Sequence, residues 1–167
     1  EVWTLPDAAE LSAYGRLEVD LRVDCPGDGH PYPATCGEWD TVGGIYLCGD
    51  PACTPGERRR LIKWITPYSA PGRWVFDLTP ELVPLAGGGD VRVVAQHGDN
   101  NVGPYTYRYT VDLRFSARPD GLRPVGLETL IPRGNYGWNE GFHDQWSTFA
   151  FTPPPGTTRV ELSARIS

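Results

Sequence analysis

The sequence lacks the motifs and the charge that several common classes of protein require. It contains no phosphate-cradling Gly-x4-Gly-Lys, no dinucleotide-binding Gly-x-Gly-x-x-Gly and no Gly-x-Ser-x-Gly, so those nucleotide-dependent and hydrolase activities have no support. Lysine occurs once, at Lys63, and the net charge is -6, which argues against a nucleic-acid partner. No apolar run approaches the roughly 18 residues that a membrane-spanning helix needs.

Methionine is absent, and the chain begins at Glu1. We therefore expect a mature segment from which any export signal has been removed. The four cysteines fall into two close pairs, Cys25 with Cys36 and Cys48 with Cys53, and each pair flanks a loop of turn-forming residues. Three pairings are formally possible, and adjacent pairing is the one that we predict. Disulfides indicate a secreted, periplasmic or cell-surface protein.

A metal site has little support in the sequence. A zinc site with four cysteine ligands is the alternative to two disulfides, but the Cys-x2-Cys spacing of such sites is missing. The three histidines, His30, His97 and His143, are scattered along the chain. We predict no metal and no cofactor.

Long helical periodicity is also missing, and short alternating runs separated by turns take its place, as is typical of a β-sandwich. Residues 15–24 alternate strictly between apolar and charged side chains, which predicts a strand with one buried and one wet face. Further strands are predicted over residues 42–47, 58–65, 73–78, 91–96 and 105–115, with one helical turn at residues 79–83. After a predicted linker at residues 117–121 come weaker strand patterns at residues 125–131, 146–151 and 158–166.

The segment that points to chemistry is Cys36-Gly37-Glu38-Trp39-Asp40. If these residues enter a strand, Glu38 and Asp40 share one face and Trp39 lies on the other. Two carboxylates on one face beside a cross-linked loop form a rigid site, in which one carboxyl group can take a raised pKa. The alternative is a cross-linked turn with two solvated acids.

The order of motifs resembles the peptide-N-glycosidase F family, which removes N-linked glycans from glycoproteins. After Cys25 and the segment 36–40, the resemblance is carried by Gly44-Ile45-Tyr46-Leu47, Ile65-Thr66-Pro67-Tyr68, Phe76-Asp77-Leu78-Thr79 and Tyr109-Thr110-Val111-Asp112-Leu113. These motifs follow the family's order with similar gaps and cover about residues 17–116.

That resemblance implies an all-β fold of two antiparallel jelly-roll sandwiches with a cleft between them. Residues 1–117 would form the first jelly roll, and residues 118–167 the linker and the opening strands of a second, incomplete one. Half a sandwich leaves strand edges uncovered, so we expect a second polypeptide or a missing C-terminal half as partner. The alternative is that the 167 residues make one complete, altered sandwich.

The resemblance also implies an activity: hydrolysis of the side-chain amide of a glycosylated asparagine in an N-glycoprotein or glycopeptide, without a cofactor. Asp40 would be the catalytic residue, with Glu38 and Trp39 shaping the site. The family has an arginine directly after the catalytic aspartate, and this chain has Thr41. Where the family has a glutamate and a tryptophan at the end of a later strand, this chain has Gln96 and Gly98.

These departures leave a second class of function open. Gln96 can hydrogen-bond but cannot hold a charge or accept a proton at neutral pH. Asp99 is one candidate for the missing carboxylate. A catalytically silent glycan- or protein-binding module is therefore the alternative to an enzyme. A third possibility is a copper monooxygenase relative with the same two-sandwich plan, in which His97 with Asp40 or Asp99 would help to bind metal.

Overall fold

The computed structural model describes residues 1–26, 36, 40–68, 70–98, 106–129 and 150–162. Its first compact unit, Glu1–Pro124, holds all of the strands and helices that are described. In chain order these are β1 Val2–Asp7, α1 Ala8–Leu11, β2 Arg16–Asp24, β3 Val42–Cys48, the 3₁₀ helix η1 Pro55–Glu57, β4 Arg58–Ile65, β5 Gly72–Asp77, the 3₁₀ helix η2 Thr79–Leu82, β6 Gly88–His97 and β7 Arg108–Ser116.

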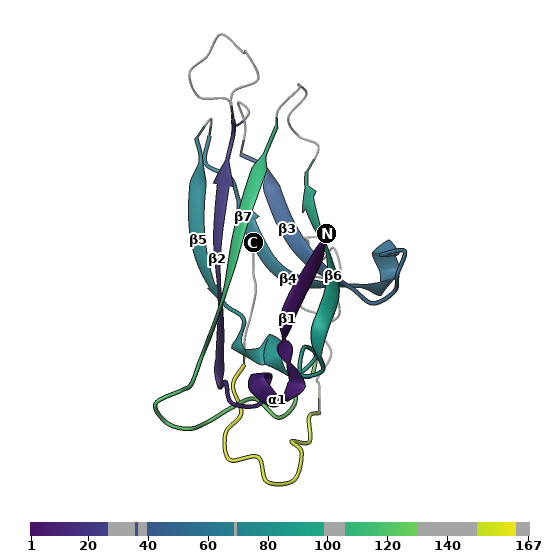
Figure 1. The fold of residues 1–167 in the computed structure, drawn as a ribbon, viewed down its shortest axis with the longest axis vertical. Helices are drawn as coiled ribbons and strands as arrows, with labels where there is room; N and C mark the ends of the chain where they lie inside the picture. Colours follow the sequence, from purple (N-terminus) through teal and green to yellow (C-terminus); the bar gives the residue numbers. More distant parts are fainter. Residues whose placement is uncertain (27–35, 37–39, 69, 99–105, 130–149, 163–167) are drawn as a thin grey trace, which may run out of the picture. The chain divides into compact units, whose positions relative to one another are not determined.

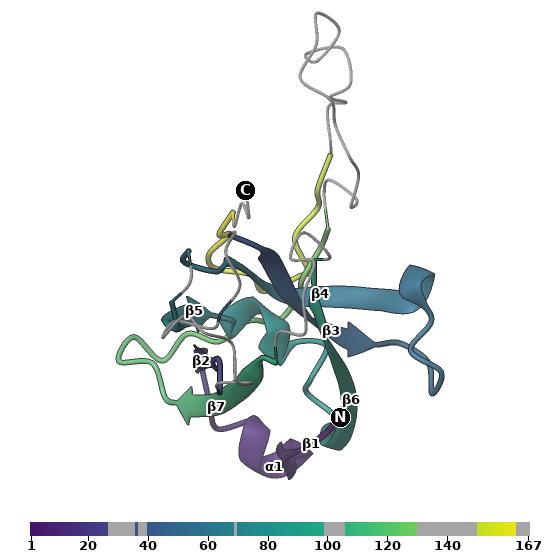
Figure 2. The same cartoon turned by 90° about the horizontal axis from the view of Figure 1, so that it is seen from above.

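The seven strands form two antiparallel sheets. One has the order β1-β6-β3-β4 and the other the order β5-β2-β7. The two sheets lie as separate layers in the views of Figure 1 and, from above, Figure 2. The predicted all-β antiparallel sandwich is therefore confirmed; its assignment as a jelly roll stays a prediction.

Strand β2 shows how the sequence builds the core. Its alternate residues Leu17, Val19, Leu21 and Val23 are at most 1% exposed, and they face the space between the sheets. Each such side chain contributes about 1.5–3 kcal/mol by leaving water. Leucine and isoleucine side chains from β3, β4 and η2, among them Ile45, complete this core.

The outer face of the three-stranded sheet carries charged residues. Asp20, in the centre of β2, is buried because Arg73 of β5 and Arg114 of β7 bind its carboxylate from both sides. Arg73 Nε lies 2.8 Å from Asp20 Oδ1. Hydrogen bonding from Arg73, followed by the charges of Arg114 and Arg73, holds the pKa of Asp20 below its usual value.

The second compact unit comprises residues 125–167. Of the three strands predicted there, the described parts (residues 125–129, 150–151 and 158–162) form no strand, so the prediction is wrong for these residues. An alternation of apolar and polar residues shows which side of a strand would be buried. A strand also needs a neighbouring strand whose backbone pairs with its N–H and C=O groups. Whether residue 117 ends the first domain stays a prediction. No helix among the described residues is long and apolar enough to cross a membrane.

Gly43 of β3 is closely packed against the neighbouring strand β4. A Cβ atom at this position would lie 2.2 Å from the indole ring of Trp64 on β4. Gly43→Ala therefore forces Trp64 out of place, and we expect a loss of about 1–3 kcal/mol in the free energy of unfolding. Urea unfolding measures the loss. Gly56→Ala is the control, because a Cβ there meets no atom within 4 Å; an equal loss in both variants would contradict this account.

Candidate functional site

Asp40 lies directly before strand β3, on the outer side of the four-stranded sheet. Side chains alternate along this segment: Thr41 is 1% exposed and points inward, whereas Val42 is 43% exposed and points outward. Asp40 is exposed on the same side as Val42 and makes no hydrogen bond with another described residue. The Asp40 carboxylate is therefore exposed to solvent just before the start of β3.

The register of the sheet places Gln96 on the face that carries Asp40. Gln96 of β6 is paired with Gly44 of β3, and the Gly98 N–H donates to the Val42 carbonyl at 2.9 Å. Gln96 is exposed, and its neighbour His97 points the other way, toward the core. Two residues proposed from the sequence thus share one face of neighbouring strands, 56 positions apart in the chain.

Lys63 is a further candidate site residue, which the sequence motifs do not indicate. It lies on β4 opposite Gly44, on the other flank from Gln96, and it is the only lysine of the chain. Burial, and then the nearby charge of Arg60, lowers the pKa of Lys63. The outer face of β6-β3-β4 therefore carries a cation as well as Asp40 and Gln96.

The chain next to Asp40 is fixed by Thr66, which follows β4. The Thr41 N–H donates to Thr66 Oγ1 (2.8 Å), and the Thr66 N–H donates to the Thr41 carbonyl (2.9 Å). The Thr66 hydroxyl also donates to that carbonyl, at 3.3 Å. Thr66 is 3% exposed, so water competes little for these bonds.

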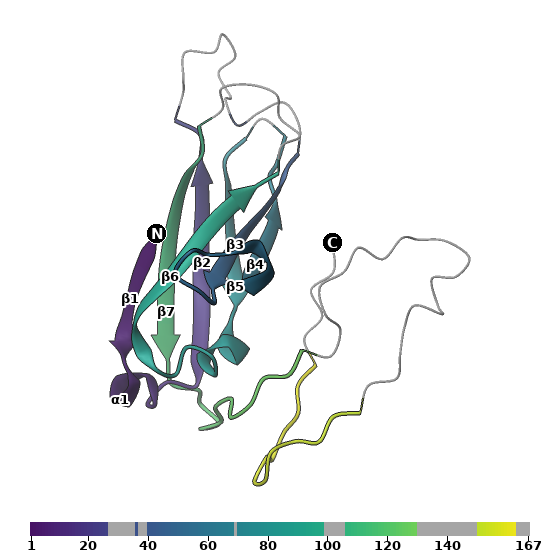
Figure 3. The same ribbon diagram turned by 90° about the vertical axis from the view of Figure 1, so that its right-hand side faces the viewer.

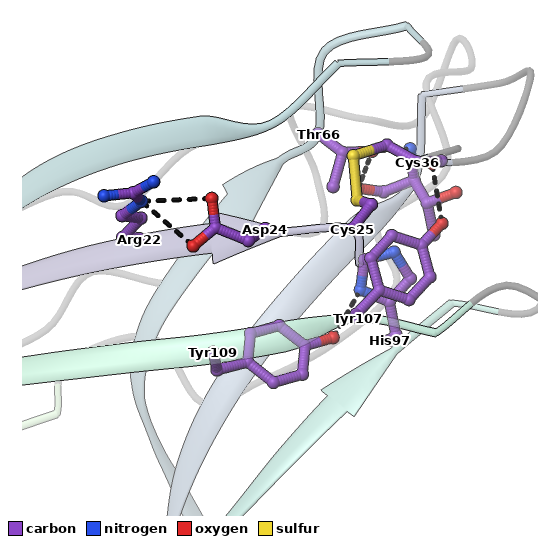
Figure 4. Close-up of a disulfide and its surroundings, with 9 residues drawn as sticks. Arg22, Asp24, Cys25, Cys36, Thr66, His97, Tyr107 and Tyr109 are labelled. Atoms are coloured by element: carbon purple, nitrogen blue, oxygen red, sulfur yellow. Dashed lines mark hydrogen bonds and ion pairs between the residues drawn. A yellow bond between two sulfur atoms is a disulfide. The ribbon is translucent and has the colours of Figure 1, made fainter. Parts of the chain in front are cut away.

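On the other side of Asp40 along the chain lies the disulfide between Cys25 and Cys36 (Figure 4). Cys36 is 1% exposed, and the Tyr107 hydroxyl donates to its carbonyl at 2.9 Å. The second disulfide joins Cys48 and Cys53. All four sulfur atoms are thus in disulfides, in the adjacent pairing, which removes the zinc alternative and suggests an oxidising, extracellular environment.

His97 lies beneath this end of the sandwich, against two tyrosines. Its ring stacks on Tyr107 with 4.0 Å between centroids, and its Nδ1 lies 2.9 Å from the Tyr109 hydroxyl. Its Nε2 is buried and has no hydrogen-bond partner among the described residues. Burial lowers the pKa of His97, and burial together with the charge of Tyr107 raises that of Tyr109 to about 12. His97 is therefore neutral and packed between aromatic rings.

The aromatic contacts continue from Tyr109 into the core. Trp64 of β4 lies edge-on to Tyr109, with 5.8 Å between centroids, and also contacts Trp74 of β5 at 6.4 Å. Since Tyr109 and Trp74 belong to one sheet and Trp64 to the other, these rings join the two layers below the Asp40 end.

This environment of His97 makes stability depend on pH. In the unfolded chain His97 takes up a proton below about pH 6.5, whereas the folded protein resists that proton because its pKa is lowered. The stability that neutral His97 contributes to the folded state is intact above about pH 6.5 and is lost as the pH falls below it. His97→Phe keeps the stacked ring, so its unfolding free energy should fall less than that of the unchanged protein between pH 7.5 and pH 5. Denaturant titrations measure both free energies of unfolding. If the two proteins lose the same free energy over this pH range, His97 is not the cause of the pH dependence.

Three of the site residues proposed from the sequence, Glu38, Trp39 and Asp99, lie outside the described residues. Their roles stay predictions, as does that of Asp40. His30 and His143 also lie outside, and the described part of the chain contains no group of three metal-ligating side chains. His97 is engaged with Tyr107 and Tyr109.

Comparisons with protein-family models, with curated proteins and with solved structures found no match to this chain.

Proposed function

We propose that this chain belongs to an exported glycoamidase, which hydrolyses the side-chain amide between asparagine and an N-linked glycan. The observation that carries the proposal is the outer face of β6-β3-β4. Asp40 and Gln96 lie on it together, at the strand ends where the resembled family has its catalytic aspartate and an acidic helper. The shared face follows from the strand register and not from the resemblance.

In the proposed reaction Asp40 acts as the general base. Its carboxylate takes a proton from a water molecule, whose oxygen bonds to the amide carbon of the glycosylated asparagine. The resulting tetrahedral oxygen needs hydrogen-bond donors. Gln96 is opposite Gly44, about 13 Å along the sheet from Asp40, so its amide would bind another part of the substrate. Breaking of the C–N bond leaves aspartate in the peptide and a glycosylamine, which takes up the proton.

Lys63 would supply a positive charge on the same face, opposite Gly44 and so four positions along the strand from Asp40. The resembled family has an arginine directly after its aspartate. Thr41 occupies that position here, but it is 1% exposed and points into the core, so it cannot contact a substrate. Lys63 lies on the outer face of the sheet, which in this proposal is the substrate side.

The direct test is to incubate the protein with a denatured N-glycoprotein. Release of the whole glycan, with conversion of its asparagine to aspartate, is the expected result, and peptide mass spectrometry detects it. If the glycopeptide stays intact, in the presence or absence of other parts of the protein, the proposed activity is wrong.

The second candidate function is a glycan-binding module without catalysis. It is favoured by the uncharged Gln96 and by the exposed apolar pair Val42 and Ile65, which face each other across β3 and β4 beside Asp40. Apolar side chains suit the apolar face of a sugar ring. A glycan array tests this function, and binding that is unchanged in Asp40→Asn, with no cleavage, would favour it.

The finer architecture belongs to the same proposal. The described sandwich would be the first of two jelly rolls, and further polypeptide would complete the second. The two disulfides support an exported protein, in the periplasm, at the cell surface or secreted.

A further inference from the structure

We infer that two hydroxyl groups, those of the buried Thr66 and the partly buried Tyr107, position Asp40 for catalysis. This inference rests on the proposed function, because positioning matters only if Asp40 reacts. Neither residue carries a charge or contacts the solvent-exposed carboxylate through a described bond. Both are therefore positioning residues and not catalytic ones.

The side chain of Thr66 replaces a main-chain hydrogen bond that is missing between the ends of β3 and β4. In an antiparallel pair of strands, every second pair of opposite residues exchanges two main-chain hydrogen bonds. Between Thr41 and Thr66 only the Thr66 N–H makes its main-chain bond; the Thr41 N–H is received by the Thr66 side-chain hydroxyl. Because Pro67 follows, the chain leaves the sheet here, and the hydroxyl keeps Thr41 in register after the main-chain carbonyl has turned away.

Tyr107 fixes the chain on the other side of Asp40. Its hydroxyl donates to the main-chain carbonyl of Cys36, whose sulfur is bonded to Cys25 (Figure 4). The stacked ring of His97 keeps the Tyr107 ring in place, and Tyr109 binds His97 from the other side. The carbonyl of Cys36 is thus held by a side chain 71 positions away in the chain.

In the chain, Asp40 lies directly before Thr41 and four positions after Cys36. Asp40 makes no hydrogen bond of its own with a described residue, so its neighbours set its place. A displacement of the reacting group by about 1 Å can cost about 10²-fold in rate. Loss of either hydroxyl should therefore lower kcat without removing any group that contacts the substrate.

The test uses variants that remove one hydroxyl and keep the shape of the side chain, Thr66→Val and Tyr107→Phe. We expect kcat for glycan release to fall about tenfold or more in each, with KM within about twofold, because substrate contacts stay intact. Thr66→Ser, which keeps the hydroxyl, should restore kcat. The matched controls are Thr79→Val and Tyr14→Phe: Thr79 Oγ1 accepts from the Leu17 N–H at 3.3 Å, and the Tyr14 hydroxyl donates to Glu10 at 3.2 Å, both away from Asp40.

The outcomes separate the inference from the proposed function. Unchanged kcat in both hydroxyl variants of an active protein would overturn the inference and leave the activity standing. An inactive unchanged protein would overturn the proposed function and the inference with it. If Thr66→Val fails to fold, Tyr107→Phe, which loses a single oxygen atom, decides alone: a fall in kcat beyond that of Tyr14→Phe supports the inference, and an equal kcat overturns it.

Discussion

Asp40→Asn should reduce the rate of glycan release by about 10²–10⁴-fold, the range that a positioned general base contributes. The amide has nearly the shape of the carboxylate but cannot accept a proton from water at neutral pH. Its thermal unfolding should match that of the unchanged protein, because Asp40 is exposed and has no hydrogen bond with another described residue. Initial rates on a fluorescent glycopeptide, with a melting curve for each protein, measure both effects.

The control for the charge change is Asp90→Asn. Asp90 lies at the opposite end of β6 from His97 and Gln96, and its Oδ1 accepts from the Thr4 hydroxyl at 2.7 Å, a bond that an asparagine oxygen can keep. Its activity should equal that of the unchanged protein. An Asp40→Asn protein as active as the Asp90→Asn control would remove Asp40 from the mechanism.

Loss of the disulfide between Cys25 and Cys36 should reduce both stability and activity. Its cysteines are 11 positions apart, and release of such a loop costs about 3 kcal/mol. Cys36 is also the residue whose carbonyl Tyr107 holds, so kcat should fall by at least about tenfold through the displacement of Asp40. Urea unfolding and glycan release by a Cys25→Ser, Cys36→Ser protein measure the two effects.

The second disulfide provides the comparison. Cys48 and Cys53 are 5 positions apart at the other end of β3, so their removal should cost about 2 kcal/mol and leave kcat unchanged. If both pairs of substitutions lower kcat equally, the disulfide near Asp40 has no special role. If the first variant does not fold, the same comparison is made at temperatures where it does, with the fraction folded measured by circular dichroism.

Most strands of the first unit are predictable from the sequence, because each presents one face to a continuous core. In β2 the buried apolar positions alternate from Leu17 to Val23, and the prediction for residues 15–24 agrees with Arg16–Asp24. The pattern of the first 14 residues predicts no element, yet these residues contain β1 and α1. Strand β1 contains a proline and pairs on one side only, with β6, so it has the weak pattern that edge strands show.

The site is only partly predictable. The segment that contains Asp40 and the adjacent disulfide pairing are local in the chain, and their residue types are distinctive. The bonds that hold the segment are not local: Thr66 is 25 positions from Thr41, and Tyr107 is 71 from Cys36. A threonine and a tyrosine are common residues, and only the sheet register shows that they meet this segment. The same holds for Lys63, whose face is known only once β3 and β4 are paired.

Departures from the resembled family become easier to interpret in three dimensions. From the sequence, Thr41 and Gln96 are two lost charges. In the structure Thr41 points into the core and Gln96 points out, so only Gln96 can affect chemistry at the face. Lys63 returns a positive charge to that face. Among the described residues of β6 and β4, the carboxylate on this face is Asp90, at the opposite end of β6 from Gln96.

The measurement that tests the central claim most directly is hydrolysis in water enriched in heavy oxygen. The account predicts that a glycopeptide treated with the unchanged protein yields an aspartate peptide carrying one heavy oxygen atom, because water attacks the amide carbon. The Asp40→Asn protein should yield none in the same time. Intact glycopeptide with both proteins, or equal labelling with both, would contradict the claim that Asp40 activates water at this face.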